Sequence, residues 1–169
     1  MERAMKPKTV GRWDGGLATK PPVDAGGLSA ESIILTLDGE KSVTDLRPGD
    51  RIVTRDTGKA VVRQIKAAWH RVHVVRIQAG SLGHTRPDRD VILPAGQMIL
   101  VRDWRAQAIF GARETLVPVS RLVDGEFVTL RDRQDILLFS LVFDAAHILY
   151  VDGLELASAV TTAPRSVRA

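Results

Sequence analysis

From residue 33 onward, short apolar runs alternate with turn residues along the chain. The runs are rich in Val, Ile, Leu and Thr, which is the composition typical of β-strands. We expect strands at 33–37, 51–55, 60–65, 72–77, 91–93, 98–101, 126–130, 136–143, 147–151 and 154–156. Residues 111–125 place apolar side chains three and four apart, a spacing that predicts one or two helical turns, although Pro118 makes a long helix unfavourable there. The pattern predicts an all-β domain with little helix.

Three turn signals lie between these runs. Asp38-Gly39 and Asp152-Gly153 supply the positive-φ residues that tight hairpins need, so each pair is expected to join neighbouring antiparallel strands. Pro48-Gly49 is typical of a type II turn. A polar stretch at 78–90 predicts a longer loop between two strands.

The two ends of the chain differ from its middle. Residues 1–27 contain Gly and Pro pairs among isolated charges, so we expect a flexible leader before a domain at 28–158 and a flexible tail at 159–169. Residues 1–30 carry five positive and three negative groups and residues 159–169 carry two positive groups, which leaves 17 of each sign at 31–158. A neutral body favours neither nucleic acid nor a membrane as a partner.

Composition excludes several classes of site. The chain has no cysteine, which removes disulfides, thiolate metal sites and cysteine nucleophiles. Its N-terminus lacks the apolar core of a secretory signal, and no run approaches the ~18 apolar residues of a membrane span. We expect a monomer without a cofactor. The compartment stays open, with the cytoplasm as the default.

Several motifs, in a fixed order, resemble the bacterial short form of the Hint domain, the module shared by hedgehog autoprocessing domains and inteins. They are T-x-x-G from Thr36, V-x-D-L-x-P-G-D from Val43, V-x-T-x-D from Val53, R-I-x-A-G-x-L-G from Arg76, and L-x-F-D-x-x-H-x-L-Y-V-x-G-x-E from Leu141. The resemblance covers residues 27–158 and implies a flattened horseshoe of about ten to twelve short strands.

In that family, a Cys or Ser at the first domain residue attacks the preceding carbonyl, and a Thr-x-x-His element protonates the departing amine. Carried over residue by residue, the nucleophile position falls on Gly27 and the Thr-x-x-His element on Leu93 to Gly96. The terminal His-Asn pair of splicing members falls on Ala157-Ser158. None of these positions has the required nucleophile or general acid.

Three residues remain as catalytic candidates. Ser29 would be the nucleophile if the register slipped by two residues. His147 matches a histidine of the family's last block and is a candidate for acid-base work, with a buried structural histidine as the alternative. Asp144 could orient His147 or stabilise its turn. His70 and His73, three apart, would point to opposite faces of one strand, so we predict no metal site.

Six arginines could group into an anion site. At isolated loop positions they are more typical of solvated charges. They are Arg86, Arg89, Arg102, Arg105, Arg131 and Arg133.

Two functional hypotheses follow. The first is a Hint descendant that has lost self-cleavage and acts as a binding or structural module, whose partner is unknown and for which a protein is the candidate class. The second is an autoprocessing enzyme that cleaves its own leader near Gly27 or Ser29 by an N-to-O acyl shift. Fold alone does not choose between them.

Overall fold

The computed structural model describes residues 26–83 and 85–158. Among these residues it has twelve strands, one α-helix and two 3-10 helices. The strands are β1 (Leu28–Ser29), β2 (Ile33–Thr36), β3 (Gly39–Ser42), β4 (Arg51–Thr54), β5 (Gly58–Val61), β6 (Gln64–Ile77), β7 (Val91–Pro94), β8 (Met98–Val101), β9 (Thr115–Pro118), β10 (Val128–Val142), β11 (Ile148–Val151) and β12 (Leu154–Ala157). The helices are η2 (Val43–Asp45), α1 (Trp104–Phe110) and η3 (Val119–Leu122).

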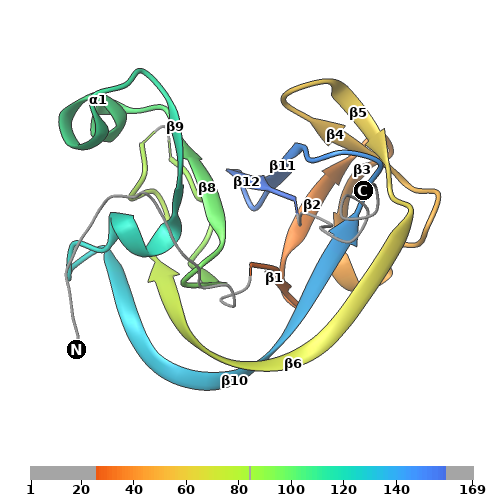
Figure 1. Ribbon diagram of the computed structural model, residues 1–169, viewed down its shortest axis with the longest axis horizontal. Helices are drawn as coiled ribbons and strands as arrows, with labels where there is room; N and C mark the ends of the chain where they lie inside the picture. The colour runs from red at the N-terminus through yellow and green to blue at the C-terminus, as the bar shows by residue number, and fades with distance from the viewer. Residues whose placement is uncertain (1–25, 84, 159–169) are drawn as a thin grey trace, which may run out of the picture.

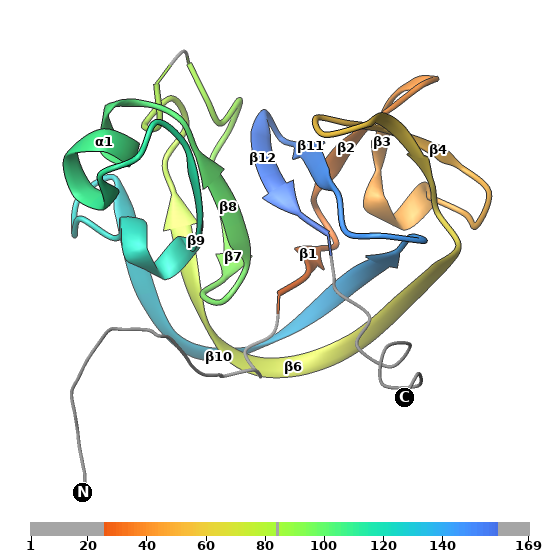
Figure 2. The same ribbon diagram turned by 45° about the horizontal axis from the view of Figure 1, so that its top comes forward.

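A long antiparallel ribbon of β6 and β10 shapes the molecule. It is paired from Gln64 opposite Val142 to Ile77 opposite Val128, with a bulge between Arg131 and Gln134. Figure 1 and Figure 2 show the ribbon curving beneath two lobes, with β7, β8, β9 and α1 at one end and β2 to β5 with β11 at the other. The predicted all-β horseshoe with little helix is therefore confirmed.

A second sheet joins the two lobes across the opening of the horseshoe. Its strands follow the order β3-β2-β4-β11-β12-β8-β9, with β5 paired to β4. The pairing of Leu156 on β12 with Ile99 on β8 links the lobes directly. Both residues belong to a continuous core that also contains Ile34, Ile52 and Val75. Full burial of such a side chain stabilises the fold by about 1.5–3 kcal/mol relative to leaving it exposed.

The turn predictions agree with the structure, except that Asp38-Gly39 is not itself the loop of its hairpin. Asp152 and Gly153 have φ values of 53° and 82° and join β11 to β12, with Val151 opposite Leu154. The first hairpin also joins antiparallel strands, but its loop is Leu37 and Asp38, because Gly39 already pairs with Thr36. Gly49 has a φ of 99°, as a type II turn requires.

Other predicted elements differ from the structure. The predicted runs at 126–130 and 136–143 fall mostly on one strand, β10, which spans 128–142. The run at 60–65 is divided between β5 and β6, and the run at 72–77 is the second half of β6. The predicted helical turns at 111–125 are wrong for 115–118, which form β9, and right only for the 3-10 turn η3. Helix α1 was not predicted, although Asp103 accepts a hydrogen bond from Arg105 N–H at its start and Gly111 ends it at a φ of 71°.

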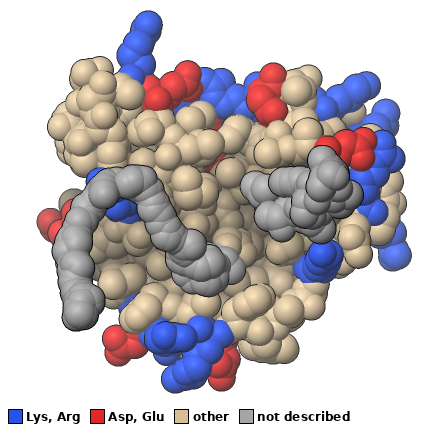
Figure 3. All heavy atoms as spheres, viewed as in Figure 1, with Lys and Arg blue, Asp and Glu red and all other residues tan. Residues whose placement is uncertain are grey.

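Charge on the described surface is mixed. Figure 3 shows both signs around the edge of one face and mostly uncharged atoms in its middle. No helix within residues 26–83 and 85–158 is long and apolar enough to cross a membrane. The predicted leader and tail lie outside the described residues, apart from Gly26 and Gly27.

Candidate functional site

Three distant segments meet at the buried side chain of Gln97, which is 3% exposed. Its Oε1 accepts a hydrogen bond of 2.7 Å from the backbone N–H of Gly27, just before β1. Its Nε2 donates to the carbonyl of Ala157 at the end of β12 (2.8 Å) and to that of Met98 (3.0 Å). One carboxamide therefore ties the start of the domain to its end.

The backbone holds Gln97 in this position. Gln97 N–H donates to the Pro94 carbonyl and closes the turn between β7 and β8, and the Gln97 carbonyl accepts from Val119 N–H. Because the backbone is bonded on both sides and the carboxamide makes three hydrogen bonds, neither end of the side chain is free to move without leaving buried polar groups unpaired.

Gly27 occupies a site that does not accept a side chain without strain. Its φ is 145°, a value that residues with a Cβ rarely adopt. A Cβ added there would lie 3.0 Å from the Leu138 Cβ and 3.4 Å from the Phe139 carbonyl oxygen, both on β10. At the position where the resemblance places the nucleophile, both the backbone conformation and the neighbouring atoms thus favour glycine.

Gly96 and Ala157, two other positions of the predicted catalytic set, lie beside Gln97 in the chain or in contact with it. Leu93 is fully buried in the core, and Gly96 follows it in the β7–β8 turn. Ala157 contributes only its backbone carbonyl to Gln97. Among the described residues, Gln97 is the one whose side chain reaches the N–H of the Gly26–Gly27 peptide bond.

Ser29 lies on β1, which pairs with β10 opposite Leu138. Its hydroxyl is 3.4 Å from that of Ser32, which is 1% exposed. A second hydroxyl has no basic atom that could take up the proton of the first at neutral pH, so this contact does not activate Ser29 as a nucleophile.

His147 precedes β11 and is held by Asp56. Its Nδ1 lies 2.9 Å from Asp56 Oδ2, and since a carboxylate only accepts, Nδ1 carries the proton. The other oxygen, Oδ1, accepts from Ile148 N–H at 3.0 Å. Burial alone raises the pKa of Asp56, but the hydrogen bonds from Ile148 and His147 outweigh it and hold that pKa below the usual value.

The backbone of His147 is also bonded. Its N–H donates to Ser158 Oγ (2.9 Å), and its carbonyl accepts from Ser158 N–H (2.8 Å). The ring packs edge-on against Phe143, with ring centroids 5.6 Å apart. This arrangement fixes the imidazole, as either a structural or an acid-base role would require.

Asp144 does not orient His147 in this structure. Its carboxylate accepts two hydrogen bonds from the guanidinium of Arg63, at 3.1 and 3.0 Å. The Asp144 side chain is 75% exposed, and the Arg63 hydrogen bond lowers its pKa. The described structure therefore brings His147 together with Asp56 and Ser158, and leaves Asp144 and Ser29 in separate contacts.

Sequence reasoning missed Gln97 and Asp56. Gln97 is the one amide within the otherwise apolar block at 91–101, a signal for a buried polar contact. Asp56 is the last residue of the V-x-T-x-D motif, but a contact 91 residues away along the chain does not follow from spacing.

Metal ligands do not converge in the described part of the chain, where no three His, Cys, Asp or Glu side chains form a group able to hold an ion. His70 and His73 both lie on β6, and His73 Nδ1 is 3.2 Å from the Arg131 carbonyl oxygen.

Comparison with known proteins agrees with this fold. A family model for the Hint domain matches residues 27–163. Among solved structures, a DnaB intein from Synechocystis is 13% identical with a TM-score of 0.54, the match covering 80% of this chain and 100% of the intein. A bacterial intein-like domain from Clostridium thermocellum is 12% identical with a TM-score of 0.52, covering 80% of this chain and 99% of that domain.

At these identities the structural likeness shows the fold alone. No curated protein sequence matches the chain. The family model matches well over half of the 169 residues, from Gly27 to beyond β12. The chain belongs to the Hint domain family.

Proposed function

We propose that this Hint domain has lost self-cleavage and acts as a binding or structural module. The observation that carries the proposal is the hydrogen bond from Gly27 N–H to Gln97 Oε1. That N–H belongs to the peptide bond that a Hint enzyme would break if its nucleophile stood at residue 27. Cleavage of a peptide bond requires a proton for the departing nitrogen.

Gln97 supplies no such proton. It faces the nitrogen with a carbonyl oxygen, which only accepts, while its two N–H donors point to the carbonyls of Ala157 and Met98. An imidazole nitrogen can gain or lose a proton near neutral pH and so change between acceptor and donor, whereas the oxygen of a carboxamide remains an acceptor. The contact favours the intact peptide bond.

The nucleophile position supports the same proposal. Glycine has no side chain, and its φ of 145° with the close approach of Leu138 disfavours any residue with a Cβ. The alternative, an N-to-O acyl shift at Ser29, needs a base at the hydroxyl, whereas the neighbour of Ser29 is the Ser32 hydroxyl and His147 is bonded to Asp56 and Ser158.

Intact-mass measurement tests the proposal. The purified full-length chain is incubated with and without dithiothreitol or hydroxylamine, with a cleaving intein as positive control for the reagents. We expect a constant species of 18.5 kDa. Loss of a fragment ending at residue 26 or 28 would overturn the proposal, and Ser29→Ala would then show which register is used.

A Gly27→Cys, Gly96→His double variant asks whether the two missing groups alone account for the loss. Because Gln97 still accepts from residue 27 and the added side chain meets Leu138, we expect no cleavage in this variant. Its folding is checked by circular dichroism, so that an unfolded variant is not scored as inactive.

A further inference from the structure

The middle of the β6–β10 ribbon is exposed along one edge. Residues 66–71 of β6 are all exposed, although they lie within one continuous strand. β6 pairs with β10 from Gln64 to Ile77, but on its other side it pairs with β7 only over 74–77. Among the residues that the structure describes, no strand pairs with the rest of this edge, and Figure 1 and Figure 2 show none beyond it. The ribbon therefore offers a place for a third strand.

One hydrogen bond identifies the backbone groups along this edge. The His73 carbonyl accepts from Ala95 N–H at 2.9 Å, so the backbone of His73 faces the side of β7. Because the N–H and C=O groups of alternate residues in a strand point to the same side, those of Ala67 and Trp69 also face this edge. In the described part of the chain they have no partner strand there. Two donors and two acceptors are thus open to an added strand.

Trp69 supplies an apolar contact beside these groups. Its side chain is 69% exposed, and its cross-strand partner on β10 is Leu137, which is half-buried. Side chains alternate along a strand, so Ala67 lies on the same face as Trp69. The small Ala67 leaves room beside the indole for a bulky side chain of an added strand.

The charge of β6 favours an acidic partner. The strand contains no Asp or Glu between residues 64 and 77. Lys66 forms no ion pair with any described residue, and Arg71 has only an exposed pair with Asp135 at 3.3 Å, which is a weak contact. A second copy of β6 on this edge would place cations opposite cations, which is unfavourable. An edge lysine guards against such self-association and attracts a strand of opposite charge.

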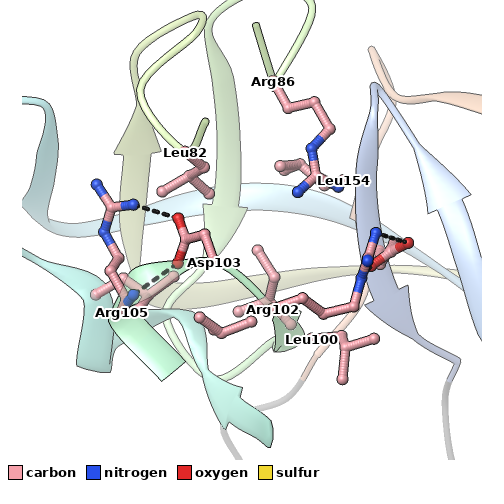
Figure 4. Close-up of a pocket in the computed structure, with 11 residues that line it drawn as sticks. Leu82, Arg86, Leu100, Arg102, Asp103, Arg105 and Leu154 are labelled. Atoms are coloured by element: carbon pink, nitrogen blue, oxygen red, sulfur yellow. Dashed lines mark hydrogen bonds and ion pairs between the residues drawn. The ribbon is translucent and has the colours of Figure 1, made fainter. Parts of the chain in front are cut away.

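The arginines between β8 and β12 differ in this respect. Arg102 donates to both oxygens of Glu155, at 2.6 and 2.9 Å, and Arg105 donates to Asp103 at 2.5 Å. The dashed lines in Figure 4 mark the contacts with these two carboxylates. Their charges are already neutralised, whereas that of Lys66 is not.

We infer that the edge of β6 at residues 65–71 binds an extended acidic segment of a partner protein, which adds to the ribbon as an antiparallel strand. β7 is antiparallel to β6 further along the same edge, so the added strand continues an existing arrangement. Backbone hydrogen bonds supply affinity in this kind of recognition, and alternate side chains supply specificity. The inference rests on the proposed function in one respect, since it names the partner of a binding module.

The register of such a strand defines a probe peptide. Valine is placed opposite Trp69, tyrosine opposite Ala67, and glutamate opposite Lys66, His70 and Arg71, with threonine at the two remaining positions. The probe is acetyl-Glu-Glu-Val-Thr-Tyr-Glu-Thr amide. The charge control is the same peptide with its three glutamates changed to lysine.

An NMR titration of the ¹⁵N-labelled full-length chain measures binding. We expect saturable shifts of the backbone amides at 65–71 and of the Trp69 indole N–H, with a dissociation constant of about 1 mM or below. The lysine peptide should bind at least tenfold more weakly. Equal affinity for the two peptides, shifts confined to other parts of the chain, or no saturable shift overturns the inference.

Methylation of single peptide nitrogens tests strand addition without altering the protein. The N–H of the valine faces β6 in the proposed register, and the N–H of the threonine after it faces away. N-methylation of the valine should weaken binding at least tenfold, and N-methylation of that threonine should weaken it far less. Equal effects of the two methyl groups would show that the peptide does not add as a strand.

A charge reversal on the protein tests the role of Lys66. Lys66→Glu should weaken binding of the acidic peptide at least fivefold, and high salt should weaken binding to the parent. The matched control is Arg113→Glu, at an exposed position between α1 and β9, which should bind within twofold of the parent. Retained affinity in a Lys66→Glu variant that is folded by circular dichroism would show that charge does not select the partner.

Hydrogen exchange of the free chain tests whether the edge is open in solution. The amides of Ala67 and Trp69 should exchange at least tenfold faster than those of Ala68 and His70, which face β10. Protection of Ala67 and Trp69 in dilute protein would show that another part of the same chain occupies the edge. Protection that grows with protein concentration would show that a second copy does, and either result overturns the inference.

Intact mass and peptide binding are read separately. Cleavage of a chain that binds the acidic peptide would overturn the loss of self-cleavage alone. A constant mass without peptide binding would overturn this inference alone.

Discussion

Gln97 and Gly27, 70 residues apart in sequence, are joined by a buried hydrogen bond of 2.7 Å. The bond places an acceptor on the first N–H of the domain, and the other end of the same carboxamide donates to Ala157. Gln97 therefore cross-links the start and the end of the domain. It places an acceptor on the Gly27 nitrogen, where a self-cleaving relative would need a proton donor.

Replacing Gln97 with alanine should destabilise the fold. The variant leaves the Gly27 N–H and the Ala157 carbonyl without their side-chain partner, so we expect the free energy of unfolding to fall by about 2–4 kcal/mol. Urea denaturation followed by circular dichroism measures this. Gln107→Ala, at an exposed position of α1, is the matched control and should change stability by no more than about 0.5 kcal/mol. Equal stability of the two variants would show that the Gln97 hydrogen bonds to Gly27 and Ala157 do not stabilise the fold.

A side chain at Gly26 should destabilise the protein only when Gln97 is present. A Cβ there would lie 2.7 Å from Gln97 Oε1, too close for the hydrogen bond to Gly27 to survive. We expect Gly26→Ala to cost about 1–2 kcal/mol in the parent and close to nothing in the Gln97→Ala background.

The matched control for this cycle is Gly39→Ala. Gly39 has a positive φ of 106°, but a Cβ there meets nothing within 4 Å. Its substitution introduces backbone strain alone and should cost the same in both backgrounds. A Gly26→Ala cost that is unchanged by removal of Gln97 would show that the contact does not exist in solution.

The elements with a local signature were predictable from sequence. Asp152-Gly153 specifies its hairpin through two residues with positive φ, and the short apolar run at 33–37 predicts β2. The length of β6 and β10 was not predictable, because residues 66–71 are all exposed and show no apolar alternation. They stay extended through pairing with a strand more than 60 residues away. The horseshoe itself came from the resemblance rather than from periodicity.

Of the candidate site, the sequence predicted only which reactive side chains are missing from the family's catalytic positions. Gly27 and Gly96 lack reactive groups in any fold, so the absence of the nucleophile and the imidazole could be stated from sequence. The contact of Gln97 with Gly27 and that of Asp56 with His147 join segments 70 and 91 residues apart, and no spacing rule encodes such long-range contacts.

Asp56 should make stability depend on pH in the acid range. Its pKa is lowered in the folded protein, so its contribution is present above the unfolded value of about 3.9 and is lost as pH falls through the lower folded value. The stability advantage of the parent over Asp56→Asn should therefore shrink as pH is lowered below about 4. An advantage that stays constant from neutral pH to acid would contradict the role of Asp56.

The NMR resonances of the His147 ring test which carboxylate orients it, that of Asp56 or that of Asp144. Asp56→Asn replaces the acceptor at Nδ1 and should shift the ring ¹⁵N resonances of His147, whereas Asp144→Asn removes only the exposed pair with Arg63 and should leave them in place. A shift with Asp144→Asn and none with Asp56→Asn would assign the orienting role to Asp144 instead.

Asp152 should give a pH dependence of the opposite sign. The side chain is 4% exposed, and burial raises its pKa even though Arg89 at 3.0 Å acts to lower it. A raised folded pKa means that the contribution is fully present below about 3.9 and is lost as pH rises through the folded value. Asn tolerates the φ of 53° and keeps an acceptor for Ile33 N–H, but it does not titrate. The stability of Asp152→Asn relative to the parent should therefore increase as pH rises from about 3 to about 6. Urea midpoints of both proteins across this range measure the change, and parallel curves would show that Asp152 titrates at its unfolded value.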